Sequence, residues 1–456
     1  MKNYINKYFF NCIIWCAIEQ IFVAMSTVCM IKMGQSIVEK DEILRWSCLF
    51  IILLFIVFIP RYGYQRSLTK AKYNTFRMYM EDFLNSYKYK TYLCKEIEFI
   101  NPRKTFFHNE TWNVINESYD FILDFILTLF NVCFNVGIIG FVISKEFIFS
   151  YMFAFLIALV FCVWSQKKAE DLTMKFQDRH VKMNSTVLYG WDTILASNVY
   201  NCNLWNNALG ASIEETIKYA IRKLRYISSM SGVAMVISSA PVFIVLIHSL
   251  LFSTDMEEIS ALIVTLPRQI NTIQYLNIFI TLLMGWNGVY GKIQGLKKAI
   301  VIPKELEFKE RYVKFNSITI QKEGMNYNFK SMDKLICWIE SKKTGRITVR
   351  GGNGTGKSTL IIGLKTYWKD NAYYFSPNLL IYFSDSLNSS LSTGELVLLH
   401  LEEIFKNVKY QILLLDEWDA NLDVFNIEKI DDLIDKISEK KCVIEIRHRN
   451  ESSSLK

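Results

Sequence analysis

Six long runs of apolar residues constrain this chain more than any other feature of its sequence. They cover residues 9–31, 43–59, 121–143, 147–163, 230–252 and 259–286. A helix needs about 20 mainly apolar residues to cross the hydrocarbon core of a bilayer, so each run predicts a membrane-spanning helix. The first run is too long for a signal peptide, and further runs follow it. We therefore expect an all-α membrane domain of six helices in residues 1–300.

The links between these runs alternate in length and carry much of the positive charge. Short stubs join runs one and two, three and four, and five and six, whereas residues 61–117 and 165–228 form long links with ten and nine Lys or Arg. Loops rich in Lys and Arg stay on the cytoplasmic side of a membrane. We therefore expect the protein in the inner (cytoplasmic) membrane, with both long links and both termini in the cytoplasm. Little Pro or Gly in the links predicts helical extensions of the spans. The net charge of +8 then reflects topology, and we expect no nucleic-acid partner.

The pattern changes near residue 301. Short strand-like runs (ITVR, AYYF, ILLL and VIEI) alternate with helical segments as far as the C-terminus. Such alternation is typical of an α/β domain with a mainly parallel sheet. We expect this second domain to cover residues 301–456.

A glycine-rich loop between a strand and a helix gives the strongest functional signal. In RITVRGGNGTGKSTL, the spacing of Gly351, Gly356, Lys357 and Ser358 fits the phosphate-binding pattern G-x-x-x-x-G-K-[ST]. Glycines let backbone N–H groups face the phosphates at a helix N-terminus that favours anions. Lys357 is predicted to reach the β- and γ-phosphates of ATP, and the Ser358 hydroxyl to bind Mg²⁺. The remaining predicted ATP-binding residues of this loop are Asn353, Gly354, Thr355 and Thr359.

Two carboxylates follow the buried strand in QILLLDEWD. Asp416, at the end of that strand, is placed to hold Mg²⁺, and Glu417 to orient or deprotonate the attacking water. His448 follows the next strand, in VIEIRHRN, where we expect it to contact the γ-phosphate. Acid pairs after strands are common in α/β domains, so the acid pair gains its weight from the phosphate-binding loop.

With these motifs in order, the chain resembles an ATP-binding cassette (ABC) exporter, a type I/type IV half-transporter with fused membrane and nucleotide domains. The motifs LSTG and DEW are similar to those of the cyclic-peptide and peptide-siderophore exporters. The resemblance implies a signature loop that contacts the ATP of a partner chain, formed by Leu391, Ser392, Thr393, Gly394 and Glu395. It also implies that Tyr327 or Phe329 stacks on adenine and that Asp423 lies in a loop crossing to the second subunit.

The signature turn also reads as an ordinary helix start, because Ser392 and Glu395 form a capping box ahead of an apolar run. The two interpretations are compatible, since a capped helix N-terminus attracts an anion. Within one nucleotide domain, Lys357 and this turn are expected on opposite edges. They share a phosphate only if two chains meet head to tail, which predicts a homodimer or a pair with a related half-transporter.

The chain departs from the exporter pattern in the interval after the phosphate-binding loop. Only residues 377–390 remain for the helical subdomain, which has room for about one average helix. The family's glutamine is missing as well, and Ser376, Pro377 or Asn378 stands where it is expected. A reduced helical subdomain, altered coupling and slow hydrolysis follow from the resemblance.

Ionisable residues at membrane depth are costly and usually face a cavity. Glu19 and Arg268 are candidates to line a substrate cavity, with Asn271 and Gln274 near the latter; alternatively they pair with each other or with backbone. The ten cysteines show no metal-ligand spacing and are expected to be mostly buried, reduced side chains.

The predicted function is ATP-driven export of a peptide or similar amphipathic product by alternating access of a dimer. One alternative is the same fold moving lipids or drugs. Another is a nucleotide-binding regulatory or immunity protein of the membrane with little turnover.

Overall fold

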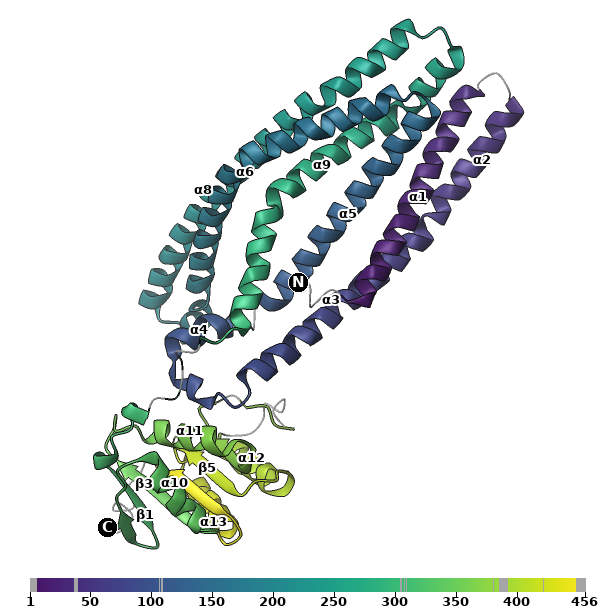
Figure 1. The fold of residues 1–456 in the computed structure, drawn as a ribbon. Helices are drawn as coiled ribbons and strands as arrows, with labels where there is room; N and C mark the ends of the chain where they lie inside the picture. The colour runs from purple at the N-terminus through teal and green to yellow at the C-terminus, as the bar shows by residue number, and fades with distance from the viewer. Residues whose placement is uncertain are drawn as a thin grey trace. The chain divides into compact units, whose positions relative to one another are not determined.

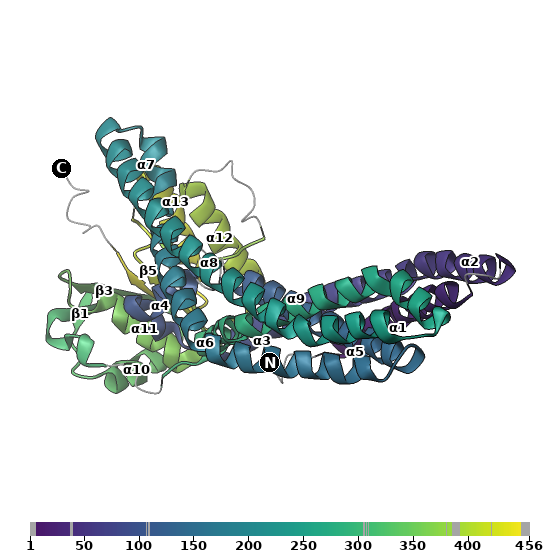
Figure 2. The same cartoon turned by 90° about the horizontal axis from the view of Figure 1, so that it is seen from above.

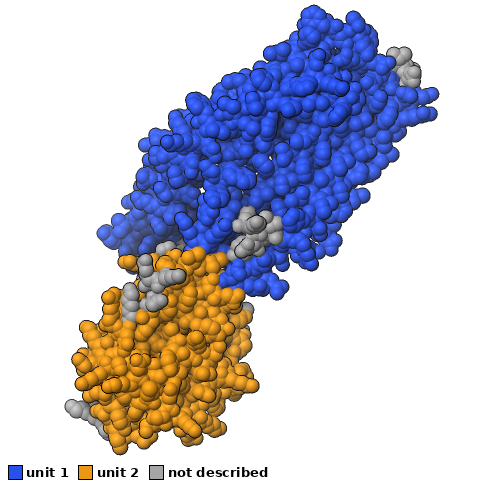
Figure 3. Space-filling view, in the orientation of Figure 1, with its two compact units in different colours: residues 1–82, 107–299 blue, residues 83–106, 300–456 orange. Residues whose placement is uncertain are grey.

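The computed structural model describes residues 6–36, 40–105, 107, 110–303, 306, 308, 310–379, 381–384, 393–420 and 422–447. The chain divides into two compact units, drawn in two colours in Figure 3. The membrane-type unit comprises residues 1–82 and 107–299, and the sheet unit comprises residues 83–106 and 300–456. Residues 83–106 thus belong to the sheet unit although they lie between two segments of the other.

The membrane-type unit is built from long helices. Its described helices are α1 (Lys7–Gln35), α2 (Lys40–Ile56), α3 (Phe58–Tyr87), α5 (Thr111–Val142), α6 (Glu146–Val187), α7 (Gly190–Ala196), α8 (Val199–Phe252) and α9 (Met256–Ile300). Five helical stretches among the described residues are long and apolar enough to cross a membrane. They contain the first five predicted runs. The sixth run lies in α9, which is not one of the five; Arg268, Gln269 and Asn271 lower its mean hydropathy.

The second long link is mainly helical, as predicted, whereas the first extends α3 only to Tyr87 and then forms two short elements, η1 (Thr91–Lys95) and α4 (Ile97–Thr105). α6 and α8 continue well beyond their apolar parts and lie side by side, with the short α7 between their ends (Figures 1 and 2). α9 is bent (Figure 1) and carries Pro267 in its interior, where proline removes a backbone hydrogen bond.

The sheet unit contains six described strands in the order β2-β1-β3-β6-β5-β4. Their bounds are β1 (Ile318–Lys322), β2 (Met325–Tyr327), β3 (Gly345–Gly351), β4 (Ala372–Phe375), β5 (Ile412–Asp416) and β6 (Cys442–Ile446). β3, β6, β5 and β4 run parallel to their neighbours, whereas β1 is antiparallel to β2 and β3. The four strands predicted from the sequence are confirmed, and the sheet is mixed.

Helices cover both faces of this sheet. α10 (Met332–Ser341) and α11 (Lys357–Trp368) share one apolar core with alternate strand residues such as Leu414. α12 (Thr393–Asn407) and α13 (Val424–Ser438) share a second core with the intervening residues, such as Leu413. Every residue of β5 and β6 is buried, as expected for strands covered on both sides.

Residues 83–106 add two small elements to the sheet unit. They are η1 (Thr91–Lys95) and α4 (Ile97–Thr105). η1 packs against α11, the helix that follows the glycine-rich loop.

Candidate nucleotide site

The glycine-rich loop connects the end of β3 to the first turn of α11. Gly356 caps this helix with φ of 91°, and the N–H of Leu360 donates to the Gly356 carbonyl at 2.8 Å. The Lys357 amine donates to the carbonyls of Gly351 and Gly352 at 2.8 and 3.1 Å, so the lysine lies over the loop. Ser358 and Thr359 occupy the first turn of α11. The free N–H groups of such a turn form an anion-binding site.

Two glycines of the loop are fixed by close backbone approach. A Cβ on Gly356 would lie 2.4 Å from the Tyr312 carbonyl oxygen, and one on Gly351 would lie 2.7 Å from the Ser317 oxygen. Gly354 also has a positive φ of 75°, but a Cβ there would meet nothing within 4 Å. The loop therefore needs glycine for packing at positions 351 and 356 and for backbone conformation at 354 and 356.

Asp416 lies at the carboxyl end of β5 and is 5% exposed. Its Oδ2 accepts a hydrogen bond from the Tyr374 hydroxyl at 3.0 Å, while its buried Oδ1 has no partner among the described residues. A buried carboxylate oxygen without a partner is costly and fits a cation ligand. No group of three His, Cys, Asp or Glu side chains that could hold a metal ion occurs in the described part of the chain. A Mg²⁺ site needs no such cluster, since water and phosphate oxygens complete its shell.

The sheet register brings these groups to one edge. Asp416 pairs with Ile446 of β6, which in turn pairs with Val349 of β3, two residues before Gly351. Adjacent strands are about 4.8 Å apart, so Asp416 lies roughly 10 Å across the sheet from β3. Ligands of open α/β sheets bind at the carboxyl ends of the strands, which is where the glycine-rich loop and Asp416 meet.

Glu417 has a backbone conformation that non-glycine residues rarely adopt. Its φ is 51°, and its N–H donates to the Ile446 carbonyl at 3.1 Å. The side chain is partly exposed, next to the buried Asp416. Unusual backbone conformations concentrate at functional sites because the surrounding structure must maintain them.

The residue after Glu417 anchors this turn. Trp418 is fully buried, and its indole nitrogen donates to Oε2 of Glu445 at 2.9 Å. Glu445 is 1% exposed and also accepts two hydrogen bonds from Arg346, each at 2.8 Å. Burial opposes the charge of Arg346, but hydrogen bonds and charge from Glu445 and Asp431 raise its pKa above the usual value. This network was not predicted from the sequence; the indole donor in DEW and the lone carboxylate inside VIEI were its signals.

The predicted signature turn falls largely outside the described residues, which include neither Leu391 nor Ser392. Thr393 begins α12, and Gly394 is buried at its first turn. A Cβ on Gly394 would lie 2.4 Å from Nδ2 of Asn426. Asp423 caps α13 and accepts from both nitrogens of Asn426, at 2.7 and 3.0 Å. Asn426 thus joins two predicted motifs, and it was not predicted from the sequence.

The N-termini of α11 and α12 belong to opposite faces of the sheet. α11 packs in the core with Leu414, and α12 in the core with Leu413. Lys357 and Gly394 are therefore separated by the sheet within one chain. No helix occurs in the described residues between β4 and α12, which include 376–379 and 381–384.

Three other predicted site residues are less connected to this edge. Tyr327 lies on edge strand β2 with its ring 4.8 Å from that of Trp338, and Phe329 packs on the same tryptophan. Glu395 is exposed on α12. His448 lies outside the described residues. The adenine-stacking and γ-phosphate roles stay predictions.

The two charged candidates of the membrane-type unit do not pair with each other. Glu19 is 2% exposed and forms an ion pair with Arg61 at 2.9 Å, leaving its Oε2 without a partner in the described structure. Arg268 donates to the Ser26 hydroxyl and the Val23 carbonyl. Both charges thus fix α1 against neighbouring helices. All ten cysteines are free, and four of them are exposed rather than buried: Cys48, Cys94, Cys133 and Cys337.

No protein-family model matches this chain, and no curated protein matches it significantly.

Proposed function

We propose that this chain is an ABC-type half-transporter, in which a nucleotide-binding domain drives transport through the helical membrane domain. The observation that carries the proposal is the meeting of two features at one sheet edge. The glycine-rich loop leads into the N-terminus of α11, and Asp416 presents a buried, unpartnered Oδ1 at the end of β5. Five membrane-length helices in the same chain support a transport role.

Each residue of the edge has a chemical role in this proposal. Backbone N–H groups of the loop and the Lys357 amine bind the phosphates of ATP. Ser358 and Asp416 hold Mg²⁺, which would neutralise charge on the phosphate oxygens. Glu417 orients the attacking water and accepts its proton. Its turn is held by the Ile446 carbonyl and by the buried Trp418.

The working unit in this proposal is a dimer in the cytoplasmic membrane, with the nucleotide domains and termini in the cytoplasm. The separation of Lys357 and Gly394 by the sheet supports it, because one phosphate then contacts both only across two chains. Residues 392–395 of one chain thus cap the ATP bound by its partner.

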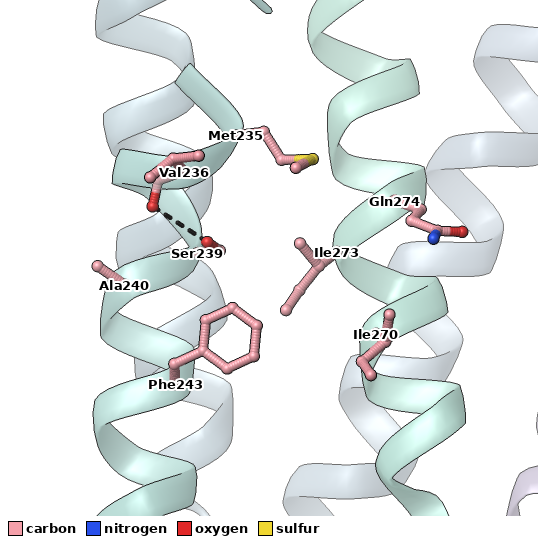
Figure 4. A pocket seen from close by; sticks show the side chains of 8 residues that line it. All are labelled: Met235, Val236, Ser239, Ala240, Phe243, Ile270, Ile273 and Gln274. Carbon is pink, nitrogen blue, oxygen red and sulfur yellow. Dashed lines mark hydrogen bonds between the residues drawn. The ribbon is translucent and has the colours of Figure 1, made fainter. Parts of the chain in front are cut away.

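A cavity of about 420 Å³ in the membrane-type unit supports an amphipathic substrate. It is lined by α8 and α9 near Pro241 and Pro267, and Met235, Phe243 and Ile273 point into the space between the helices (Figure 4). Its size is typical of ligand pockets, and its lining is mainly apolar with Ser239 and Gln274 as polar members. We propose that it receives an apolar group of a peptide-like product moving outward.

The test is nucleotide binding and phosphate release by the purified full-length protein. Lys357→Ala should weaken ATP binding at least tenfold, whereas Lys343→Ala, a change at an exposed lysine, should not. Glu417→Gln should keep ATP binding but reduce phosphate release about 100-fold or more. Unchanged ATP affinity in Lys357→Ala would show that the loop assignment is wrong.

A second candidate function is nucleotide-dependent regulation without turnover. It is favoured by the absence of a helix in the described residues between β4 and α12 and by Ser376, Pro377 or Asn378 where the family's glutamine is expected. Phosphate release from the unaltered protein no higher than from Glu417→Gln would select this function.

A further inference from the structure

The segment between α3 and α5 packs within the sheet unit. The Tyr89 hydroxyl donates to Oδ2 of Asp370, just after α11, at 2.5 Å. Leu93 in η1 is 2% exposed, and η1 packs along α11. Residues 83–106 therefore form part of the fold around the glycine-rich loop, while their two ends continue into membrane-length helices.

One side chain connects β4, which begins two residues after Asp370, to the nucleotide site. Tyr374 is the third residue of β4, and its hydroxyl donates to Oδ2 of Asp416 at 3.0 Å. It also interacts by a hydrogen bond with Ser376, which is 5% exposed. β4 packs against α11, the helix against which η1 also packs, so Tyr374 and residues 83–106 adjoin the same helix.

We propose that Tyr374 is a positioning residue that fixes the Mg²⁺-binding carboxylate of Asp416 and links its orientation to residues 83–106. The inference rests on the proposed function and deepens it. With Oδ2 held by Tyr374, Oδ1 keeps one direction toward the cation. A shift of η1 moves the surroundings of Tyr374 and so changes the carboxylate. By linkage, cation binding at Asp416 must then bias residues 83–106 to the same extent.

This link occupies the region where the family's coupling glutamine is missing. Ser376, one of the three residues at which this glutamine is expected, forms a hydrogen bond with Tyr374. Tyr374, on the strand next to that of Asp416, therefore donates the hydrogen bond to this carboxylate.

Tyr374→Phe removes only the hydroxyl and tests the proposal in the full-length protein. Two measurements are needed: the Mg²⁺ concentration that half-saturates ATP binding, and hydrogen exchange of residues 83–106 with and without Mg-ATP. We expect the Mg²⁺ requirement to rise roughly three- to tenfold, since one hydrogen bond to a charged group is lost. The affinity for ATP measured in EDTA, without Mg²⁺, should stay the same. A general structural defect would lower that affinity as well. The Mg-ATP-dependent change in exchange should disappear.

Tyr373→Phe is the matched control, because this neighbour lies in the opposite core beside Tyr410 and makes no bond to Asp416. The proposal is overturned if Tyr374→Phe keeps both the Mg²⁺ requirement and the exchange response. It also fails if the unaltered protein binds Mg-ATP with no response in residues 83–106. No ATP binding by the unaltered protein would instead overturn the proposed function itself.

Discussion

The indole nitrogen of Trp418 lies 2.9 Å from Oε2 of Glu445, and both side chains are buried. This bond joins the turn after β5 to the middle of β6. Glu417 and Asp416 lie directly before Trp418 in the chain. The hydrogen bond therefore fixes the backbone that presents the two carboxylates of the candidate site.

Trp418→Phe should lower the stability of the protein by about 2–4 kcal/mol, because it leaves a buried carboxylate with one donor fewer and a small cavity. Trp368→Phe is the matched control. Its indole nitrogen also donates to a carboxylate at 2.9 Å, but that carboxylate belongs to the exposed Glu340, which water can solvate. The loss there should be nearer ~1 kcal/mol. Thermal unfolding of both purified variants provides the comparison, and equal losses would contradict the role of burial.

Arg346→Met should destabilise the protein by about 3–5 kcal/mol, since the buried Glu445 would lose its cationic partner. Arg311→Met, at an exposed arginine, should cost less than about 0.5 kcal/mol. Adding Glu445→Gln to Arg346→Met should recover part of the loss, because the buried charge is gone. Thermal unfolding of the three variants tests this, and no recovery in the double variant would argue against an uncompensated charge.

Strong periodic signals in the sequence predict most elements of both units. The apolar runs predict the long helices, and ITVR, AYYF, ILLL and VIEI predict β3 to β6. The antiparallel strands β1 and β2 were not predicted, because ITIQK and MNY are too short and too polar to stand out. The sixth run lies in a helix that carries Arg268, Gln269 and Asn271. This helix is long enough to cross a membrane but is not among those that are also apolar enough.

The candidate site was predicted only where its residues are close in sequence. The loop 351–358 and the pair Asp416 and Glu417 are contiguous motifs. In contrast, Tyr374 contacts Asp416 across 42 positions, and Trp418 contacts Glu445 across 27. Such contacts depend on strand register, which a single sequence does not provide. The assignment of residues 83–106 to the sheet unit has the same origin.

Gly356→Ala should abolish the loop geometry, whereas Gly354→Ala should strain the loop but keep its geometry. Both glycines have positive φ, which costs an alanine about 1–2 kcal/mol. Only at Gly356 would the new Cβ also meet backbone, 2.4 Å from the Tyr312 oxygen, so we expect a further cost of about 1–3 kcal/mol there. Thermal unfolding and ATP binding by the two variants separate these contributions. Equal behaviour of the pair would mean that close packing at Gly356 has no effect.

The thiol of Cys94 should react with iodoacetamide only at higher pH than an ordinary cysteine. Desolvation raises the pKa of this thiol, with a smaller opposing effect from Lys95, although part of the residue reaches the surface. Because the thiolate is the reactive form, the alkylation rate at a given pH falls as the pKa rises. Mass spectrometry of the peptide that contains Cys94 measures this rate across about pH 7–10. The same peptide in urea-unfolded protein is the control, and its midpoint should lie at the ordinary thiol value of about 8.5. The folded midpoint should be higher; coincident curves would mean that residues 83–106 do not pack as the structure describes.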